Sequence, residues 1–262
     1  MRCRGNLMRG GCSPKPANLY WRSRLTSHSD SSQPSSGQGI ASVIAIDGPV
    51  ASGKTAVGLN LARELGYRLV DTGMIYRAVA WLTLQRGVSL DDEAAIVTLA
   101  ENARIELGQP AANSGPTISV DERDITDELR SPDVDRSVSF VSRMPGVRQA
   151  VLDLQRALAK QGRIVMLGRD IGTVVLPDAA LKVYLDASAE VRARRRHAEL
   201  IAAGNSRPEA EILAELRQRD NMDRQRHVSP LRPADDAIVI DTDRLSLDEV
   251  IARVRDAALS KS

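Results

Sequence analysis

Short apolar runs alternate with stretches of helical periodicity from residue 43 to the end of the chain. Five runs of three to five residues predict buried strands, at residues 43–46, 68–70, 164–167, 181–185 and 238–240. Between the first two runs, Val57, Leu61 and Leu65 recur every four residues and predict a helix that ends near Gly66. Strands that alternate with helices favour a parallel sheet covered on both faces, so we expect a three-layer α/β/α fold.

The middle of the chain departs from this alternation. Residues 104–107 and 117–120 predict two short strands, with a turn signal at residues 113–116 between them. Helical periodicity resumes at residues 134–141 and 147–158.

Two capping signatures predict where helices begin. Ser89 and Asp92 resemble a capping box before the helix that contains Ile96. The last helix is expected to open with a second capping box, formed by Ser246 and Glu249.

Residues 1–40 differ in composition from the rest. They hold six basic residues and a single acidic one, and they end in a stretch rich in Ser, Gly and Gln. Such a segment buries too little apolar surface to order itself, and we exclude it from the fold. A disordered tail, an Arg-rich targeting peptide and an arm for nucleic acid or membrane surfaces all fit this composition. Residues 41–262 form the expected domain.

Composition and charge narrow the class of protein. With 42% apolar and 27% charged residues in a chain of 262, one soluble α/β domain with an insertion is expected. The net charge of +2 does not indicate general nucleic-acid binding, and no apolar run is long enough to cross a bilayer. The two cysteines, Cys3 and Cys12, leave no disulfide framework. We therefore expect a cytoplasmic monomer with small-molecule partners, and with neither nucleic acid nor membrane as a partner.

A phosphate-binding motif follows the first predicted strand. The pattern G-x-x-x-x-G-K-[ST] is matched by Gly48, Pro49, Val50, Ala51, Ser52, Gly53, Lys54 and Thr55. Glycines let the backbone curl around phosphate oxygens, and the helix that follows adds the positive end of its dipole. Lys54 is placed to reach the β- and γ-phosphates of ATP, and the Thr55 hydroxyl to bind Mg²⁺. The motif therefore predicts an ATP site, which we extend to Ala56.

The class of nucleotide enzyme depends on residues outside this loop. No Asn-Lys-x-Asp tetrapeptide, which reads guanine in GTPases, occurs in the chain. Further motifs follow in order: Ile-Asp-Gly-Pro at 46–49, Asp-Thr-Gly-Met-Ile-Tyr-Arg at 71–77, Gly-Arg-Asp-Ile-Gly-Thr-Val-Val at 168–175, Pro-Asp-Ala at 177–179, Arg-Asp-Asn-Met-Asp-Arg at 219–224 and Ser-Pro-Leu at 229–231. In order and spacing, from about residue 41 to 257, the sequence resembles the bacterial cytidylate kinases.

This resemblance implies a fold and a reaction. The fold would be a parallel sheet with a phosphate loop, a monophosphate-binding insertion at about 74–160 and a short helical lid at about 190–226. The reaction would transfer a phosphoryl group from ATP to CMP or dCMP, with Mg²⁺, in pyrimidine nucleotide metabolism.

The resemblance also assigns an acceptor site. Arg77 and Arg169 would bind the acceptor phosphate, for which planar guanidinium groups are well suited. Lys54, Arg169 and Asp170 are the expected catalytic residues. Cytosine would be recognised by Ser139, Arg148 and Asp170, since its amino donor and ring acceptors pair with a carboxylate or hydroxyl beside a guanidinium.

A late helix would complete that site. Arg219, Asp223 and Arg226 have the spacing of one helix face; the first two would contact the ribose, and Arg226 the region of acceptor phosphate and base. Within the basic run at residues 192–196, Arg192 and Arg195 are expected to contact ATP from the lid.

The chain departs from the family pattern at one important place. Where many relatives carry an acidic residue before Gly-Arg-Asp, this chain has Leu167. Mg²⁺ would then depend on Thr55, the ATP phosphates and water, with Asp47 or Asp170 in support. Met222 likewise replaces a basic residue of some relatives.

Two rival hypotheses remain open at this stage. One is another small kinase, acting on uridylate, adenylate or shikimate. The other is a non-catalytic nucleotide sensor whose basic tail binds nucleic acid.

Overall fold

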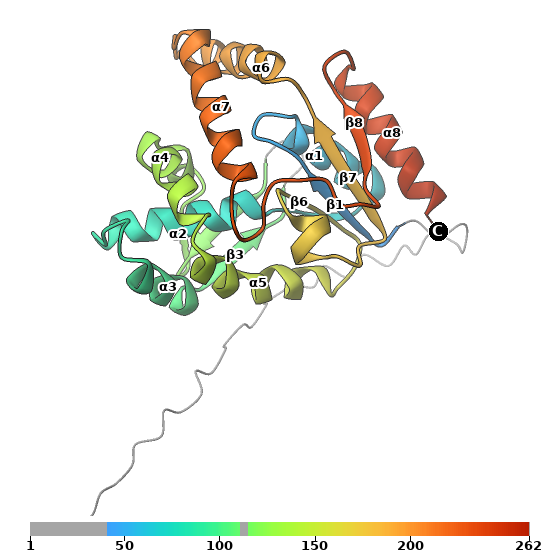
Figure 1. Cartoon of the computed structure of the whole chain (residues 1–262). Helices are drawn as coiled ribbons and strands as arrows, with labels where there is room; N and C mark the ends of the chain where they lie inside the picture. The colour runs from blue at the N-terminus through green and yellow to red at the C-terminus, as the bar shows by residue number, and fades with distance from the viewer. Residues whose placement is uncertain (1–40, 111–114, 262) are drawn as a thin grey trace, which may run out of the picture. The chain divides into compact units, whose positions relative to one another are not determined.

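The central feature is a five-stranded parallel sheet with the strand order β2-β6-β1-β7-β8 (Figure 1). The structure is a computed structural model and describes residues 41–110 and 115–261. The strands are β1 (Val43–Asp47), β2 (Arg68–Asp71), β6 (Ile164–Gly168), β7 (Leu181–Asp186) and β8 (Ile238–Asp241). Each predicted apolar run forms one of these strands, so the expected parallel sheet and α/β class are confirmed.

Eight α-helices lie within the described residues. They are α1 (Lys54–Leu65), α2 (Thr72–Gln85), α3 (Glu93–Asn102), α4 (Pro132–Val141), α5 (Pro145–Ala159), α6 (Ala189–Ala202), α7 (Glu209–Arg224) and α8 (Leu247–Ser260). A 3₁₀ turn, η1 (Glu128–Arg130), and a π-helical turn, η2 (Ile171–Val175), complete the described elements.

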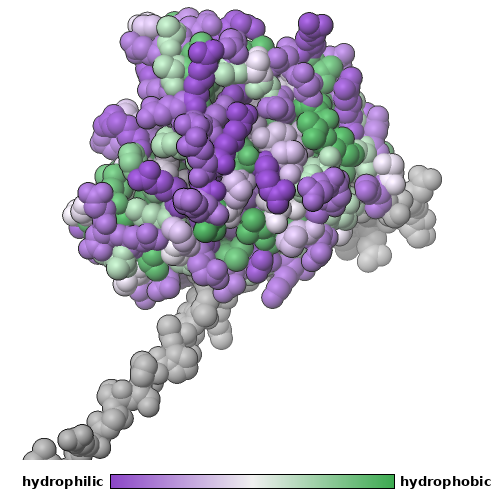
Figure 2. All heavy atoms as spheres, viewed as in Figure 1, coloured by the Kyte–Doolittle hydropathy of each residue, from purple (hydrophilic) through white to green (hydrophobic). Residues whose placement is uncertain are grey.

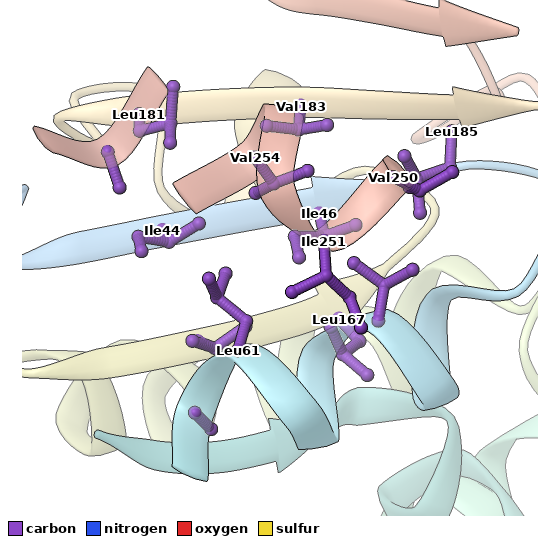
Figure 3. Packing of buried hydrophobic residues seen from close by; sticks show 14 of the residues in the cluster. Ile44, Ile46, Leu61, Leu167, Leu181, Val183, Leu185, Val250, Ile251 and Val254 are labelled. Carbon is purple, nitrogen blue, oxygen red and sulfur yellow. The ribbon is translucent and has the colours of Figure 1, made fainter. Parts of the chain in front are cut away.

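Helices cover both faces of the sheet. Alternate strand residues such as Ile44, Ile46 and Leu167 point to one face, where they pack against Leu61 of α1 and Val254 of α8 (Figure 3). Their neighbours face the other way and form a second apolar cluster with α5 and η2, which includes Ala45, Val70, Ala159, Met166 and Val175. Strands buried on both faces explain why the sequence shows continuous apolar runs there rather than alternation.

A small antiparallel sheet lies within the segment expected to form the insertion, at about residues 74–160. Its strands are β3 (Ile105–Gly108), β4 (Thr117–Val120) and β5 (Arg123–Asp124). The two predicted strands are confirmed, whereas β5 was not predicted, because two exposed polar residues carry no strand pattern. Of the predicted turn at 113–116, residues 113 and 114 lie outside the described residues.

One of the two predicted capping boxes is correct. Ser246 and Glu249 cap α8 reciprocally, as expected. The capping box at Ser89 is wrong: Asp92 is the N-cap of α3 and accepts a hydrogen bond from the Ala95 amide, while Ser89 Oγ accepts one from an amide in the preceding turn. Ser and Asp are both good caps, so the sequence alone favoured the wrong one of the two.

The surface gives little sign of apolar interfaces on the face seen in Figure 2. That face is mostly hydrophilic, with apolar residues in small separate groups. Among the described residues, none of the helices combines the length and the apolar character that crossing a membrane requires. The predictions for residues 1–40 lie outside the part of the chain that the structure describes.

Candidate functional site

The phosphate loop joins β1 to α1 through unusual backbone geometry. Gly48 has a φ of 149° and Gly53 a φ of 92°, and Ala51 also has a positive φ of 59°. A Cβ on Gly48 would lie 2.2 Å from the backbone oxygen of Leu185. Lys54 begins α1, and its Nζ donates to the Pro49 carbonyl at 2.5 Å and to Ser52 Oγ at 3.3 Å. The loop therefore curls around the lysine head group at a helix N-terminus, which is the geometry of an anion site.

The surroundings of Lys54 destabilise its charged form. Burial lowers the pKa of the Lys54 ammonium well below its ordinary value, and Arg169 nearby lowers it further. The carboxylates of Asp71 and Asp47 act in the opposite direction. An anion bound in the loop would stabilise the charged lysine.

A cavity of about 700 Å³ extends from this loop to the region of α2, α4 and α7. Eleven of the predicted site residues line it: Val50, Ala51, Lys54, Thr55, Arg77, Arg148, Arg169, Asp170, Arg219, Asp223 and Arg226. They come from segments far apart in the chain. In Figure 1, α7 descends between the sheet and the group formed by α2, α3 and α4.

Three arginines concentrate positive charge in the cavity. Arg77 donates to the Leu129 carbonyl at 3.0 Å and pairs with Asp135 at 2.5 Å. Arg169 pairs with Asp223 at 3.1 Å. Arg219 forms no ion pair with any described residue, and burial together with the nearby Arg169 lowers its pKa to about 10. Guanidinium groups crowded in this way fit a doubly charged phosphate.

A buried polar group occupies another part of the cavity. Arg148 forms an ion pair with Asp170, and its guanidinium lies 5.1 Å from the centre of the Tyr76 ring. Its Nη1 also donates to the Ser142 carbonyl at 3.0 Å, while Arg226 donates to Ser142 Oγ at 3.1 Å. Fixed donors and acceptors of this kind can recognise the edge of a base.

The late helix is arranged differently from the prediction. α7 ends at Arg224, so Arg226 lies just beyond it rather than on the same helix face as Arg219 and Asp223. Asp223 pairs with Arg226 and with Arg169, so the carboxylate links the end of α7 to the turn after β6.

Some predicted residues do not face the cavity. Ser139 is buried on α4, and it is Ser142, almost one helical turn later, that lines the cavity. Arg192 is 2% exposed, forms an ion pair with Asp220, and donates to the Val50 carbonyl at 3.0 Å. Arg195 donates to Thr242. Arg192 is thus bound to the phosphate loop and to Asp220 of α7, and is not a free lid cation.

Asp47 connects the two halves of the site. Its two carboxylate oxygens accept hydrogen bonds from the amides of Ile171 and Gly172, both at 2.8 Å. These amides follow Arg169 and Asp170 directly. Burial raises the pKa of Asp47 to about 6, against the lowering effect of the two amides. Asp170 is paired with Arg148, so both of the carboxylates expected to support Mg²⁺ already have partners within the protein.

Further residues of the cavity were not predicted to have a role there, among them Asp71, Tyr76, Asp135 and Ser142. Asp71 and Tyr76 lie inside the motif at residues 71–77, so their presence near the site could have been inferred. Asp135 is a partner of Arg77, and a contact across 58 residues leaves no local signal.

Comparison with known proteins identifies the family of the chain. The family model described as cytidylate kinase matches residues 44–259. A cytidylate kinase of Geobacillus sp. (strain WCH70) is 47% identical over 211 residues, which cover 80% of this chain and 93% of that protein. One from Exiguobacterium sp. (strain ATCC BAA-1283 / AT1b) is 45% identical, with the same two shares. A bifunctional pantoate ligase/cytidylate kinase of Synechococcus sp. (strain JA-2-3B'a(2-13)) is 48% identical over 79% of this chain and 39% of that protein. The chain therefore belongs to the cytidylate kinase family.

Proposed function

We propose that the protein transfers the γ-phosphoryl group of ATP to a phosphate oxygen of CMP or dCMP, which gives ADP and CDP or dCDP. One observation carries this proposal. The phosphate loop opens into a cavity that also holds the cation group Arg77, Arg169 and Arg219 and the buried Arg148–Asp170 pair. A phosphate donor, an acceptor phosphate and a base therefore have separate partners in one cavity.

The donor would be held by the phosphate loop. Lys54 would contact the transferring group, and the amides at the start of α1 would bind the β-phosphate. Arg192 would stabilise the loop through the Val50 carbonyl. Direct contact between Arg195 and ATP remains part of the proposal, although Arg195 is engaged with Thr242.

The acceptor would be held at its phosphate by Arg77, Arg169 and Arg219. Arg169 follows β6 directly, so it can bind the acceptor phosphate while also facing the transferred group and neutralising its charge. Asp223 would contact the ribose. The reaction needs no covalent protein intermediate, because positioning and neutralisation of charge account for most of phosphoryl-transfer catalysis.

The residues at the phosphate loop also fit a magnesium ion. Thr55 presents a hydroxyl oxygen at the N-terminus of α1, and oxygen donors suit Mg²⁺. Among the described residues there is no group of three His, Cys, Asp or Glu side chains that could hold a metal alone, so the nucleotide phosphates would complete the site. When bound, Mg²⁺ supplies positive charge to the β- and γ-phosphates.

A coupled assay of ADP release with CMP, dCMP, UMP and AMP tests the proposal. CMP and dCMP are expected to be the best acceptors, and turnover is expected to require ATP. A preference for AMP or UMP would contradict the acceptor assignment, and no turnover with any acceptor would contradict the kinase assignment.

A further inference from the structure

Carboxylates that line the cavity differ in their partners. Asp135, Asp170, Asp223 and Glu199 each pair with an arginine. Asp71 is the one carboxylate among the described lining residues that forms no such pair. Its charge is therefore not neutralised by an ion pair within the described part of the chain.

The two carboxylate oxygens of Asp71 accept hydrogen bonds from different donors. Oδ1 accepts a hydrogen bond from the Gly73 amide at 2.9 Å and so caps α2. Oδ2 accepts one from the Thr55 hydroxyl at 3.2 Å. A hydroxyl whose proton is donated to a carboxylate keeps its lone pairs free for another partner. Asp71 therefore orients the hydroxyl that ends the phosphate-loop motif.

The strand register shows why a carboxylate at this position can replace one on β6. In nucleotide hydrolases with this loop, an Asp on a neighbouring strand helps the loop hydroxyl to hold Mg²⁺. Here the end of β6 carries Leu167, which is the register partner of Asp71. Register partners on parallel strands point to the same face of the sheet. The Leu167 side chain packs closely against α1: a Cβ added to Gly58 of that helix would lie only 2.7 Å from Leu167 Cδ2.

We propose that Asp71 is the carboxylate that supports the Mg²⁺ of the bound nucleotide, by orienting the Thr55 hydroxyl and by adding negative charge beside it. This inference rests on the proposed function only as far as the nucleotide donor is concerned. The oxygen donors of Thr55 and Asp71 match the preference of Mg²⁺ for hard ligands. Asp47 and Asp170 are held by other groups, whereas Asp71 is the carboxylate that accepts the hydrogen bond of the Thr55 hydroxyl.

Manganese binding to the complex of the protein with ADP tests this inference without turnover. Free Mn²⁺ is followed by electron paramagnetic resonance during titration of the full chain saturated with ADP. Asp71→Asn is expected to weaken Mn²⁺ binding by about tenfold or more, the range found when groups that orient metal ligands are removed. The affinity for ADP in the presence of EDTA is expected to change little, because Asn still caps α2.

A matched control separates metal support from helix capping. Asp92→Asn makes the same change at the N-cap of α3, outside the cavity, and is expected to leave Mn²⁺ affinity unchanged. Wild-type Mn²⁺ affinity in Asp71→Asn would overturn the inference. If Asp71→Asn fails to fold, Thr55→Val removes the other half of the pair, and unchanged Mn²⁺ affinity in that variant would overturn it as well. A protein that binds Mn²⁺ and ADP as expected but prefers an acceptor other than CMP would contradict only the proposed function.

Discussion

Arg148 and Asp170 form an ion pair inside the cavity, and each side chain is only 6% exposed. Removing one partner of a buried pair leaves an uncompensated charge, at a cost of about 3–5 kcal/mol in the free energy of unfolding. Such a pair is therefore a fixed element of the site. The Tyr76 ring on one side and the Ser142 carbonyl on another hold the guanidinium in place.

This fixed pair leads to a prediction about base discrimination. UMP differs from CMP by an oxygen in place of the amino group and by a proton on the ring nitrogen, so it would leave polar groups of the pocket unpaired. The wild-type protein is expected to use UMP less efficiently by about tenfold or more in kcat/KM. Arg148→Ala is expected to reduce kcat/KM for CMP more than for UMP, while the KM for ATP changes little.

Steady-state kinetics with both acceptors measure this ratio, and thermal melting checks that the variant is folded. An unchanged ratio of CMP to UMP efficiency in a folded Arg148→Ala protein would show that this pair does not read the base.

Arg169→Ala is expected to have a different effect. Because Arg169 is assigned to the acceptor phosphate, which all nucleoside monophosphates share, its loss should reduce kcat/KM for CMP, dCMP and UMP by a similar factor. Removing one preorganised donor of this kind lowers turnover by about 10²-fold or more. The same acceptor panel measures the result. A variant that changes the preference among bases would contradict the assignment to the phosphate.

Sequence patterns predicted the sheet and the loop well because both depend on local signals. Buried parallel strands appear as apolar runs, and the phosphate loop has fixed spacing between its glycines and lysine. The partners of charged residues were not predictable in this way. Arg192 was expected to contact ATP from the lid, and only its buried partner Asp220, 28 residues later, shows it to be structural.

Helix faces were the second source of error. Ser139 and Ser142 are both serines at the end of α4, and only the packing of the helix decides that Ser142 lines the cavity. Arg226 was assigned to a helix face because the spacing allowed it, but α7 ends before it. Boundaries of this kind depend on tertiary contacts more than on residue preferences.

Two glycines of the loop offer a matched pair of substitutions. Gly53 has a φ of 92°, and a Cβ added there would meet only open space, so Gly53→Ala introduces backbone strain alone. A loss of about 1–3 kcal/mol in the free energy of unfolding is expected. Gly48→Ala adds a contact of 2.2 Å with the backbone oxygen of Leu185. A backbone atom cannot move aside as the end of a flexible side chain can. The free energy of unfolding should therefore fall clearly more in Gly48→Ala than in Gly53→Ala. Urea unfolding compares the two, and equal losses would show that the Leu185 contact can be relieved.

The turnover number kcat is expected to depend strongly on the charge of Lys54. Lys54→Ala should lower kcat by about 10²-fold or more, because the lysine provides preorganised charge for the transferring phosphoryl group. Lys160→Ala, at an exposed position after α5, is the matched control and should leave kcat unchanged. Near-normal turnover in a folded Lys54→Ala protein would contradict the proposed role of the loop.

Asp47 is expected to make the stability of the protein depend on pH. Its pKa is raised to about 6 in the folded state by burial. In the unfolded chain an Asp has a pKa of about 3.9. Between these values the folded state binds more protons, so the contribution of Asp47 to the free energy of unfolding falls as pH rises. A difference of about two pKa units corresponds to roughly 3 kcal/mol.

Asp47→Asn removes this titration. The variant is expected to gain stability relative to the wild type as pH rises from about 4 to 6, with no further change above that range. It should also be less stable than the wild type by a constant amount, because Asn offers one oxygen to the two amides of Ile171 and Gly172. Urea unfolding of both proteins at pH values across this window measures the difference.

Asp236→Asn provides a control of opposite sign. The hydrogen bond from Lys182 lowers the pKa of the exposed Asp236, so its stabilising effect is present at neutral pH and is lost as pH falls through the lowered pKa. That variant should therefore lose stability relative to the wild type as pH rises through about 4, the ordinary range of an Asp. If the difference between Asp47→Asn and the wild type stayed constant from pH 4 to 7, the buried carboxyl would not titrate in this window. The hydrogen bonds from the Ile171 and Gly172 amides to Asp47 would then have to stabilise the fold equally well whether the carboxyl group is charged or neutral.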